Sequence, residues 1–285
     1  MINMIRSDIY RLLRSKVLII PIALVLYAVI ASVVNIAPAA IGTTDLLGLF
    51  QAETIVSQPM MELIKEKSYG ELQELPIKVL REMTLSSGYQ YDRAALSCNF
   101  NMLYFVLVAA GVSINQDFTC GCIKNTLSSA VGRGRYFASK VLVVNLAAIA
   151  GTAVHSFIIF WVSRIINGSA VSAGGAVVFR SFCRQIPAIM ALTSVYVLLA
   201  FVVRSGVLYN ILGILLPEGF SLIYLLTDSV KRLHFLQKYD IMVIMLRSVT
   251  DVALSYTITS SLVCAAVMAL SYGAGYTLFR RLDIK

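Results

Sequence analysis

The sequence contains few charged residues. They make up 14% of the 285 residues, against roughly 25% in soluble proteins. Acidic residues are the scarcer kind, because 15 Asp and Glu stand against 24 Lys and Arg, which gives a net charge of +9. The mean hydropathy is +0.80. These values argue against a water-soluble fold and against nucleic acid as a partner. We expect a membrane protein whose basic excess marks the cytoplasmic side.

Motifs for catalysis and nucleotide binding are also missing. The sequence has no G-x-x-x-x-G-K-[ST] phosphate loop, no H-E-x-x-H and no nucleophile elbow, and the cluster Gly132-Arg133-Gly134 lacks the required spacing. The two histidines, His155 and His234, have no partner at ligand or triad spacing. We therefore expect no enzyme activity, no cofactor and no metal site. Any ATP-driven work needs energy from a separate subunit.

Cysteine gives little information. There are five, an odd number. Cys120 and Cys122 form C-x-C without a nearby histidine or second cysteine pair, so we expect two free thiols and no zinc site. Cys98 and Cys183 both fall near the expected outer surface, and the sequence leaves open whether they form a disulfide.

Six apolar segments are long enough to cross a bilayer, which takes about 20 residues of helix. They cover residues 17–39, 97–114, 141–162, 186–203, 206–226 and 257–279. The fifth is interrupted at Leu216-Pro217-Glu218-Gly219. The first is longer than the apolar core of a signal peptide, so we favour an uncleaved helix. The sequence predicts an all-α polytopic membrane protein, with one transmembrane domain over residues 1–285.

The distribution of charge predicts the orientation. One face carries the N-terminal 16 residues, the loop 115–140, the turn at Arg204 and the tail from Arg280. It holds 12 basic and three acidic residues, and the opposite face holds 12 of each. The whole +9 therefore lies on the first face, which is cytoplasmic by the positive-inside tendency. Both termini are expected on this side.

The N-terminal 16 residues predict an amphipathic helix. Apolar residues recur at helical spacing and alternate with four basic ones. The basic residues are Arg6, Arg11, Arg14 and Lys16. Such a helix lies in the headgroup layer. It is also compatible with a simpler role, as a charged flank that sets orientation.

Two regions on the expected outer side have open roles. Residues 42–96 are the longest polar region and predict a small helical cap, which is either a connector or a binding region. Residues 227–256 predict re-entrant or interfacial helices, because the apolar run Ile241–Leu246 is too short to span. Glu218 is the one acid that falls within a span, which makes it a candidate functional residue. The alternative is that it caps the broken helix.

The loop between the second and third spans, Asp117 to Lys140, carries the most specific pattern. Gly121 can end the second helix, after which Ile123, Leu127 and Val131 give a short helix one apolar stripe. Basic residues surround the stripe, and Gly132 and Gly134 permit the turn back to the membrane. The basic residues are Lys124, Arg133 and Arg135. Such a helix can dock on a partner ATPase, or the loop can simply contact lipid headgroups.

This loop resembles the cytoplasmic loop of ABC-2 type transporter permeases. In that family an acid is followed by Gly-Thr, a basic residue, a Leu, an Arg and a Lys that enters the third helix. The corresponding positions are Asp117, Gly121, Lys124, Leu127, Arg133 or Arg135, and Lys140. Asp117 stands where Glu is usual and Cys122 where Thr is usual. The N-terminal run 6–16, the six-span layout and the closing segment 278–285 resemble the same family.

The resemblance implies a subunit of an ATP-driven exporter in the bacterial plasma membrane, most similar to small permeases of bacitracin and lantibiotic immunity or peptide export. Its partners would be two ATPase subunits and a second permease, identical or related. Its cargo would be an amphipathic peptide antibiotic, bacteriocin, drug or lipid-like molecule. The alternative is a membrane scaffold or sensor that binds a ligand through residues 42–96. The sequence identifies neither the cargo nor the direction of transport.

Overall fold

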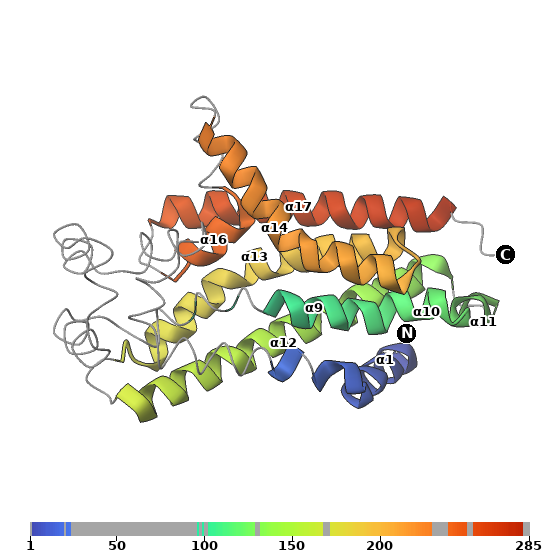
Figure 1. Ribbon diagram of the computed structural model, residues 1–285, viewed down its shortest axis with the longest axis horizontal. Coiled ribbons are helices and arrows are strands. Elements are labelled where there is room, and N and C mark those ends of the chain that lie inside the picture. The colour runs from blue at the N-terminus through green and yellow to red at the C-terminus, as the bar shows by residue number, and fades with distance from the viewer. Residues whose placement is uncertain are drawn as a thin grey trace.

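The computed structural model describes residues 2–19, 21–23, 96, 99, 102–128, 132–167, 172–229, 239–249 and 253–281. Every regular element within these ranges is helical, as the sequence predicts. The long helices lie side by side and form an elongated bundle (Figure 1). The elements are α1 (Ile2–Arg14), η1 (Lys16–Leu18), α9 (Met102–Ala110), the π-helical turn η3 (Gly111–Asn115), α10 (Gln116–Thr119), α11 (Cys122–Ser128), α12 (Arg133–Asn167), α13 (Gly175–Val202), α14 (Gly206–Ser229), α16 (Ile241–Arg247) and α17 (Leu254–Arg281).

Within the described residues, four helical stretches are long and apolar enough to cross a membrane. They are Met102–Thr119, Arg133–Ile165, Gly175–Val202 and Leu254–Arg281. They correspond to the second, third, fourth and sixth predicted spans, so the chain has the character of a membrane protein. Most of the first predicted span lies outside the described residues. The fifth corresponds to α14, whose apolar part, Gly206–Pro217, is shorter.

The helices extend beyond the apolar segments that predict them. α12 begins at Arg133, eight residues before the predicted third span, and α13 begins at Gly175 instead of residue 186. The reason is that a helix continues past the apolar core wherever packing supports it, while hydropathy marks only the part suited to lipid. Arg133, Arg135 and Lys140 therefore lie on α12 and not in a loop.

The predicted interruption of the fifth span is present as a bend and not as a gap, because α14 stays helical through Pro217 while its second half turns away from the first (Figure 1). A proline lacks the N–H that would bond the carbonyl four residues earlier, here that of Gly213. The hydroxyl of Tyr196 on α13 donates to this carbonyl at 3.1 Å. Such replacement by a neighbouring helix is what allows proline within membrane helices. The side chain of Glu218 lies outside the described residues, as do residues 42–95, so both of these proposals keep their status as predictions.

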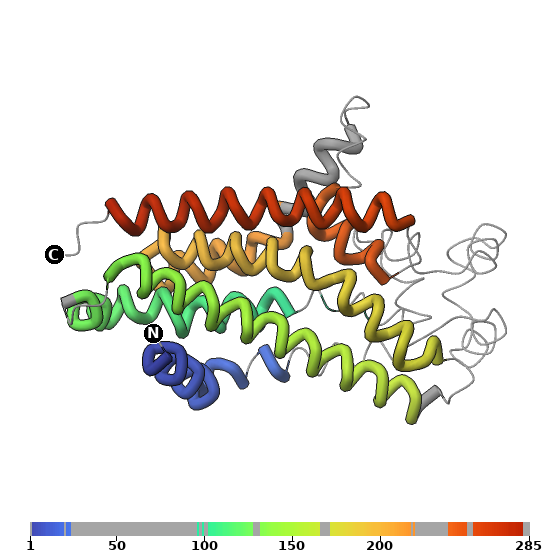
Figure 2. Tube along the Cα trace, turned by 180° about the vertical axis from the view of Figure 1, so that it is seen from behind, coloured from blue at the N-terminus to red at the C-terminus, as the bar shows by residue number. Residues whose placement is uncertain are grey.

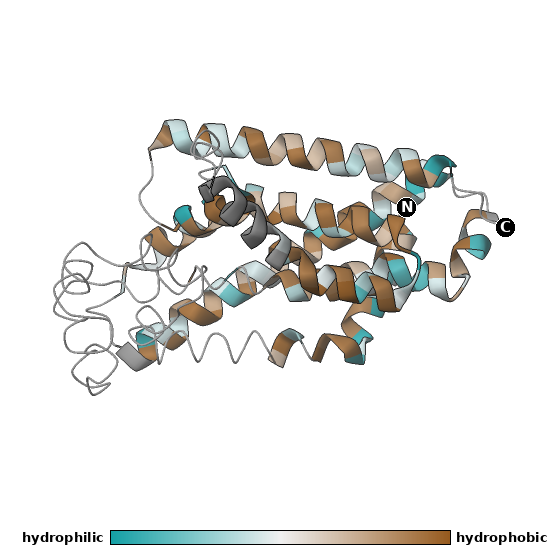
Figure 3. Cartoon of the chain, turned by 45° about the horizontal axis from the view of Figure 1, so that its top comes forward, coloured by the Kyte–Doolittle hydropathy of each residue, from teal (hydrophilic) through white to brown (hydrophobic). Residues whose placement is uncertain are grey.

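α13 is the centre of the bundle and packs against both α12 and α17 (Figure 2). Its buried face carries small residues such as Ala188 and Ala200 together with the rings of Phe182, Tyr196 and Phe201. α17, in contrast, leaves large apolar side chains such as Leu262 and Leu270 exposed. Apolar residues run along the outer faces of the long helices, while hydrophilic residues lie mainly near the helix ends (Figure 3). This surface suits a hydrocarbon environment.

α1, α10, α11 and the C-terminal end of α17 lie at the same end of the bundle (Figure 1). A side-chain contact agrees with this placement, since Arg133 at the start of α12 donates to the carbonyl of Arg280 at the end of α17. The turn at residues 203–205, between α13 and α14, belongs to the same end, because Asn115 donates to the carbonyl of Val203. The segments that we assigned to one face by charge are thus together in space.

Candidate functional site

Four charged side chains meet at this end of the bundle, and we call them the charge cluster: Asp8 and Arg11 of α1, Asp117 of α10 and Lys140 of α12. Arg11 lies 2.6 Å from Asp117 and 3.1 Å from Asp8. Lys140 lies 2.8 Å from Asp8 and 2.7 Å from Asp117. Each cation therefore bridges both carboxylates, and the four charges sum to zero.

The charge cluster is removed from solvent. Lys140 is 2% exposed, Asp117 4% and Asp8 6%, and only Arg11 keeps about a third of its side chain accessible. Burying ions costs several kcal/mol each unless close partners and hydrogen bonds compensate. The carboxylate of Asp117 is fully used, because Oδ1 accepts from Arg11 while Oδ2 accepts from Tyr136 at 2.7 Å and contacts Lys140. Oδ2 of Asp8 has no hydrogen-bond partner among the described residues.

Local helix geometry brings the members of the charge cluster together. Asp8 and Arg11 are three residues apart on α1 and therefore share one face. Arg11 also donates to the carbonyl of Ser113 at 3.2 Å, which lies in the π-helical turn η3. Such turns within α-helices often occur at functional sites. Arg11 thus fastens α1 to η3 and α10, through the carbonyl of Ser113 and the carboxylate of Asp117.

The two groups on α1 respond in different ways to this environment. Burial raises the pKa of the Asp8 carboxyl, and the positive charges of Lys140 and Arg11 offset this effect only in part. Burial alone would lower the pKa of the Arg11 guanidinium, but the hydrogen bond and charge of Asp117 raise it overall. Arg11 therefore remains a fixed cation, while Asp8 is the member of the pair on α1 that holds its charge less firmly.

An aromatic cluster connects the charge cluster to the rest of the bundle. Tyr136, whose hydroxyl donates to Asp117, stacks on Phe279 of α17 with ring centroids 5.5 Å apart. Phe118, next to Asp117, makes edge contacts with Phe201 of α13 and with Phe279, at 6.1 and 6.4 Å. A displacement of α10 would therefore act directly on α12, α13 and α17.

The short helix α11 matches its prediction. Gly121 has a φ of +70°, a left-handed conformation that favours glycine, and it separates α10 from α11. Ile123 is 3% exposed within the core, and Leu127 packs against the same core. Val131 lies outside the described residues. The apolar stripe of α11 thus faces the bundle, while Lys124 is exposed on its other side.

The predicted site residues fall into separate groups. Asp117, Lys140 and Arg11 meet in the charge cluster, whereas Lys124 and Arg135 are exposed and Arg133 bonds to the end of α17. Three other basic residues of the N-terminal segment remain exposed. These are Arg6, Arg14 and Lys16.

Sequence reasoning did not single out Asp8 or Tyr136. For Asp8 a signal was available, because it is the one acid within a basic N-terminal segment and stands three residues before Arg11. Tyr136 offered no comparable signal, since its contact depends on how α10 meets α12.

Cys120 and Cys122 form a disulfide, where we expected free thiols. The left-handed Gly121 between them turns the chain so that their Cα atoms are 5.4 Å apart. Disulfides are uncommon in the cytosol, so this bond does not support a cytoplasmic position for α11. That position is predicted from the charge distribution alone. Cys183 is an exposed free thiol, and Cys98 lies outside the described residues. Among the described residues, no group of three or more His, Cys, Asp or Glu side chains could hold a metal ion.

Comparison of the chain with known protein families, with curated proteins and with solved structures finds no match.

Proposed function

We propose that this chain is the transmembrane subunit of an ATP-driven exporter of the ABC-2 type, with its charged end in the cytoplasm. It would work in the bacterial plasma membrane with a second permease copy, identical or related, and with two ATPase subunits. Its cargo would be amphipathic, such as a peptide antibiotic, a bacteriocin, a drug or a lipid-like molecule. The observation that supports the proposal best is a series of contacts. α11 adjoins α10, and Asp117 and Phe118 of α10 contact α1, α12, α13 and α17.

Docking and transmission are carried by different residues in this proposal. The exposed side chains of Lys124 and Arg135 would meet an acidic groove on the ATPase. Ile123, on the buried face of α11, would transmit the movement of the ATPase to the bundle, because a packed side chain cannot move alone. Gly121 would act as the hinge between α11 and α10.

The charge cluster would pass this movement on to whole helices. Asp117 lies on α10, which precedes Gly121 and α11, and its contacts hold α1 and α12 at once. The aromatic contacts of Phe118 extend the linkage to α13 and α17. The bundle would therefore respond as a unit and alternate between inward and outward access as the ATPases close and open.

A charge reversal on α11 tests the docking role. Lys124→Glu places an acid on the exposed face of α11 without touching the buried contacts. We expect loss of co-purification with a candidate ATPase subunit that binds the wild type, and loss of cargo-stimulated ATP hydrolysis, with unchanged thermal stability. Arg6→Glu, an exposed basic residue on α1, is the matched control and should leave both measurements unchanged.

Two outcomes would contradict the proposal. If Lys124→Glu and the wild type bind the ATPase equally, α11 is not the docking surface. If no ATPase binds at all, but deletion of residues 42–96 abolishes the cellular phenotype, the scaffold or sensor function replaces the transport function.

A further inference from the structure

A second buried polar group lies in the other half of the bundle, and we call it the amide network: Asn99, His155, Ser156 and Gln185. Gln185 is fully buried, and its Nε2 donates to the carbonyls of Leu96 and Met245 at 3.2 and 3.1 Å. Polar side chains at this depth in a membrane bundle are expensive to keep and mark candidate functional sites.

The amide network fixes the protonation of His155. Carbonyl oxygens can only accept, so the Gln185 atom facing Leu96 and Met245 must be the nitrogen, and its Oε1 faces Asn99. Asn99 then donates through Nδ2 to Gln185 at 2.6 Å, which leaves its Oδ1 toward Nδ1 of His155 at 2.7 Å. Nδ1 of His155 therefore carries the proton. In the neutral ring, Nε2 is an acceptor.

This acceptor is unused. Nε2 of His155 is buried and has no hydrogen-bond partner among the described residues, although the residue is only 1% exposed. A buried polar atom without a partner costs about 1–3 kcal/mol. A ligand with a hydrogen-bond donor would remove this cost.

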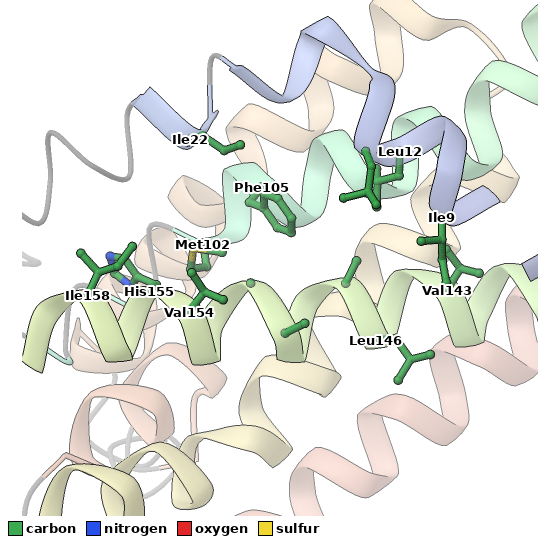
Figure 4. A pocket seen from close by; sticks show the side chains of 14 residues that line it. Ile9, Leu12, Ile22, Met102, Phe105, Val143, Leu146, Val154, His155 and Ile158 are labelled. Atoms are coloured by element: carbon green, nitrogen blue, oxygen red, sulfur yellow. The ribbon is translucent and has the colours of Figure 1, made fainter. Parts of the chain in front are cut away.

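His155 also lines a long apolar groove of about 520 Å³ between α1, Ile22, α9 and α12. Its other walls include Ile9, Leu12, Met102, Phe105, Ala150 and Ile158. Figure 4 shows His155 and Ile158 at one end and Ile9 and Val143 at the other. The groove follows α12 from Val143 to Ile158, about 22 Å at 1.5 Å per residue. Its volume and apolar lining with one polar group are typical of small-molecule sites.

Small residues on α12 line the middle of the groove: Ala147, Ala150 and Gly151. Gly151 allows α9 to pack closely here, because a Cβ at this position would meet Met102 and Phe105 at 2.8 Å. Nε2 itself has no exposed surface, so a ligand group reaches it only after a neighbouring side chain moves. Met102 lines the groove beside this end, and methionine is unbranched and readily changes conformation (Figure 4).

We infer that this groove binds an amphiphile with a long unbranched hydrocarbon chain and a terminal hydroxyl group that donates to Nε2 of His155. The length of the groove accommodates the chain, and the unused acceptor selects the hydroxyl. Ile9 and Leu12 contact the groove from α1, the same helix that carries Asp8 and Arg11. The ligand would therefore fill the space under α1 and hold that helix in place. The assignment does not depend on an ATPase partner.

A photoreactive probe tests the inference without changing the protein. The probe is a long-chain primary alcohol with a diazirine at mid-chain, and its partner is the methyl ether of the same compound, which lacks the donor. We expect the alcohol to label residues 143–158 of α12 saturably in detergent, with competition by unlabelled alcohol. The ether should label this segment about fivefold less, the effect of one lost hydrogen bond.

Two variants locate the site by filling space. Ala150→Phe enlarges an exposed groove residue and should reduce saturable labelling of α12 about tenfold. Ala265→Phe makes the same change at an exposed position of α17 outside the groove and should have no effect. Equal labelling by alcohol and ether, or labelling that rises linearly and ignores Ala150→Phe, would overturn the inference and leave ordinary lipid contact as the explanation.

Discussion

The charge cluster and the amide network are both buried polar groups that join several helices, but they differ in charge and in the kind of bond that holds them. The charge cluster joins α1, α10 and α12 through four ion pairs, and every oxygen of Asp117 is engaged. The amide network joins α12, α13, α16 and the residues Leu96 and Asn99 through neutral hydrogen bonds. Each group leaves one buried acceptor without a partner among the described residues: Oδ2 of Asp8 in the charge cluster, and Nε2 of His155, which lines the apolar groove, in the amide network.

This difference indicates different roles. A balanced set of buried ions tolerates little displacement, because separating any pair exposes an uncompensated charge to a poor solvent. Such a group suits the transmission of movement between helices. Neutral hydrogen bonds cost less to rearrange, and an unused acceptor can take a ligand. We therefore expect the charge cluster, at one end of the bundle, to be rigid and the amide network, further along the bundle, to be adaptable.

The largest effect on stability is expected from removing one charge of the charge cluster. Asp117→Asn keeps the shape of the side chain but leaves Arg11 and Lys140 against Asp8 alone, with a net buried charge of +1. We expect a loss of about 3–5 kcal/mol in the free energy of unfolding, measured by denaturant titration in bicelles. Lys140→Gln should cost a similar amount.

The double variant Asp117→Asn/Lys140→Gln separates charge balance from local damage. It restores neutrality, since Asp8 and Arg11 remain, so its loss should be clearly smaller than the sum of the two single losses. Strict additivity would show that the four charges do not act as a unit. Arg6→Gln, at an exposed position on α1, serves as the control for loss of a charge and should leave stability unchanged.

A smaller effect is expected from breaking the amide network. Gln185→Leu keeps a similar volume and removes one bond to Asn99 and two to main-chain carbonyls. Hydrogen bonds within membrane bundles contribute about 0.6 kcal/mol each on average, so we expect a loss of about 2 kcal/mol in the same assay. The variant should also reduce the preference for the alcohol probe over its ether, because Asn99 is then free to reorient and His155 can change its tautomer.

A loss as large as that of Asp117→Asn would contradict the proposed difference between the two regions. Thr193→Val is a suitable control for α13, because Thr193 is equally buried but bonds only to the carbonyl of Ile189 in its own helix. It should cost less than Gln185→Leu.

Local patterns predicted the helices well, because hydropathy and helical spacing depend on neighbouring residues. The apolar stripe of α11 and the break at Gly121 followed from spacing and from glycine's freedom to adopt a positive φ. The contact that satisfies the carbonyl of Gly213 could not be predicted, since it comes from the Tyr196 hydroxyl of another helix.

The sites divide in the same way. Asp117 and Lys140 were found through their positions in the loop pattern, but their burial depends on α1 folding back onto α12, which brings together residues 132 positions apart. The place of His155 in the amide network was missed, because His155 contacts Asn99, which is 56 positions away, and Asn99 in turn contacts Gln185, which is 86 positions from Asn99. Sequence spacing detects partners on one helix and gives no information on contacts between helices.

The smallest effect concerns the pH dependence of the stability that Asp8 contributes through the charge cluster. Burial raises the pKa of Asp8 above its usual value of 3.8, against the opposing charges of Lys140 and Arg11 and with the repulsion of Asp117. The folded protein therefore binds this proton at a higher pH than the unfolded chain does. Between these two pKa values, the contribution of Asp8 to stability rises as the pH falls.

Asp8→Asn removes this contribution and keeps the shape of the side chain. The wild type should gain stability relative to the variant as the pH is lowered toward 3.8, which unfolding titrations at a series of pH values between 7 and 4 would measure. The comparison uses the difference between two proteins because the acids away from the charge cluster are common to both and cancel. Asp117 repels Asp8, so its own titration is part of the measured difference. A wild type that loses stability relative to the variant over this range would mean that Lys140 and Arg11 outweigh burial at Asp8. The charge cluster would then be held by Asp8 as firmly as by Asp117, although Oδ2 of Asp8 has no partner among the described residues.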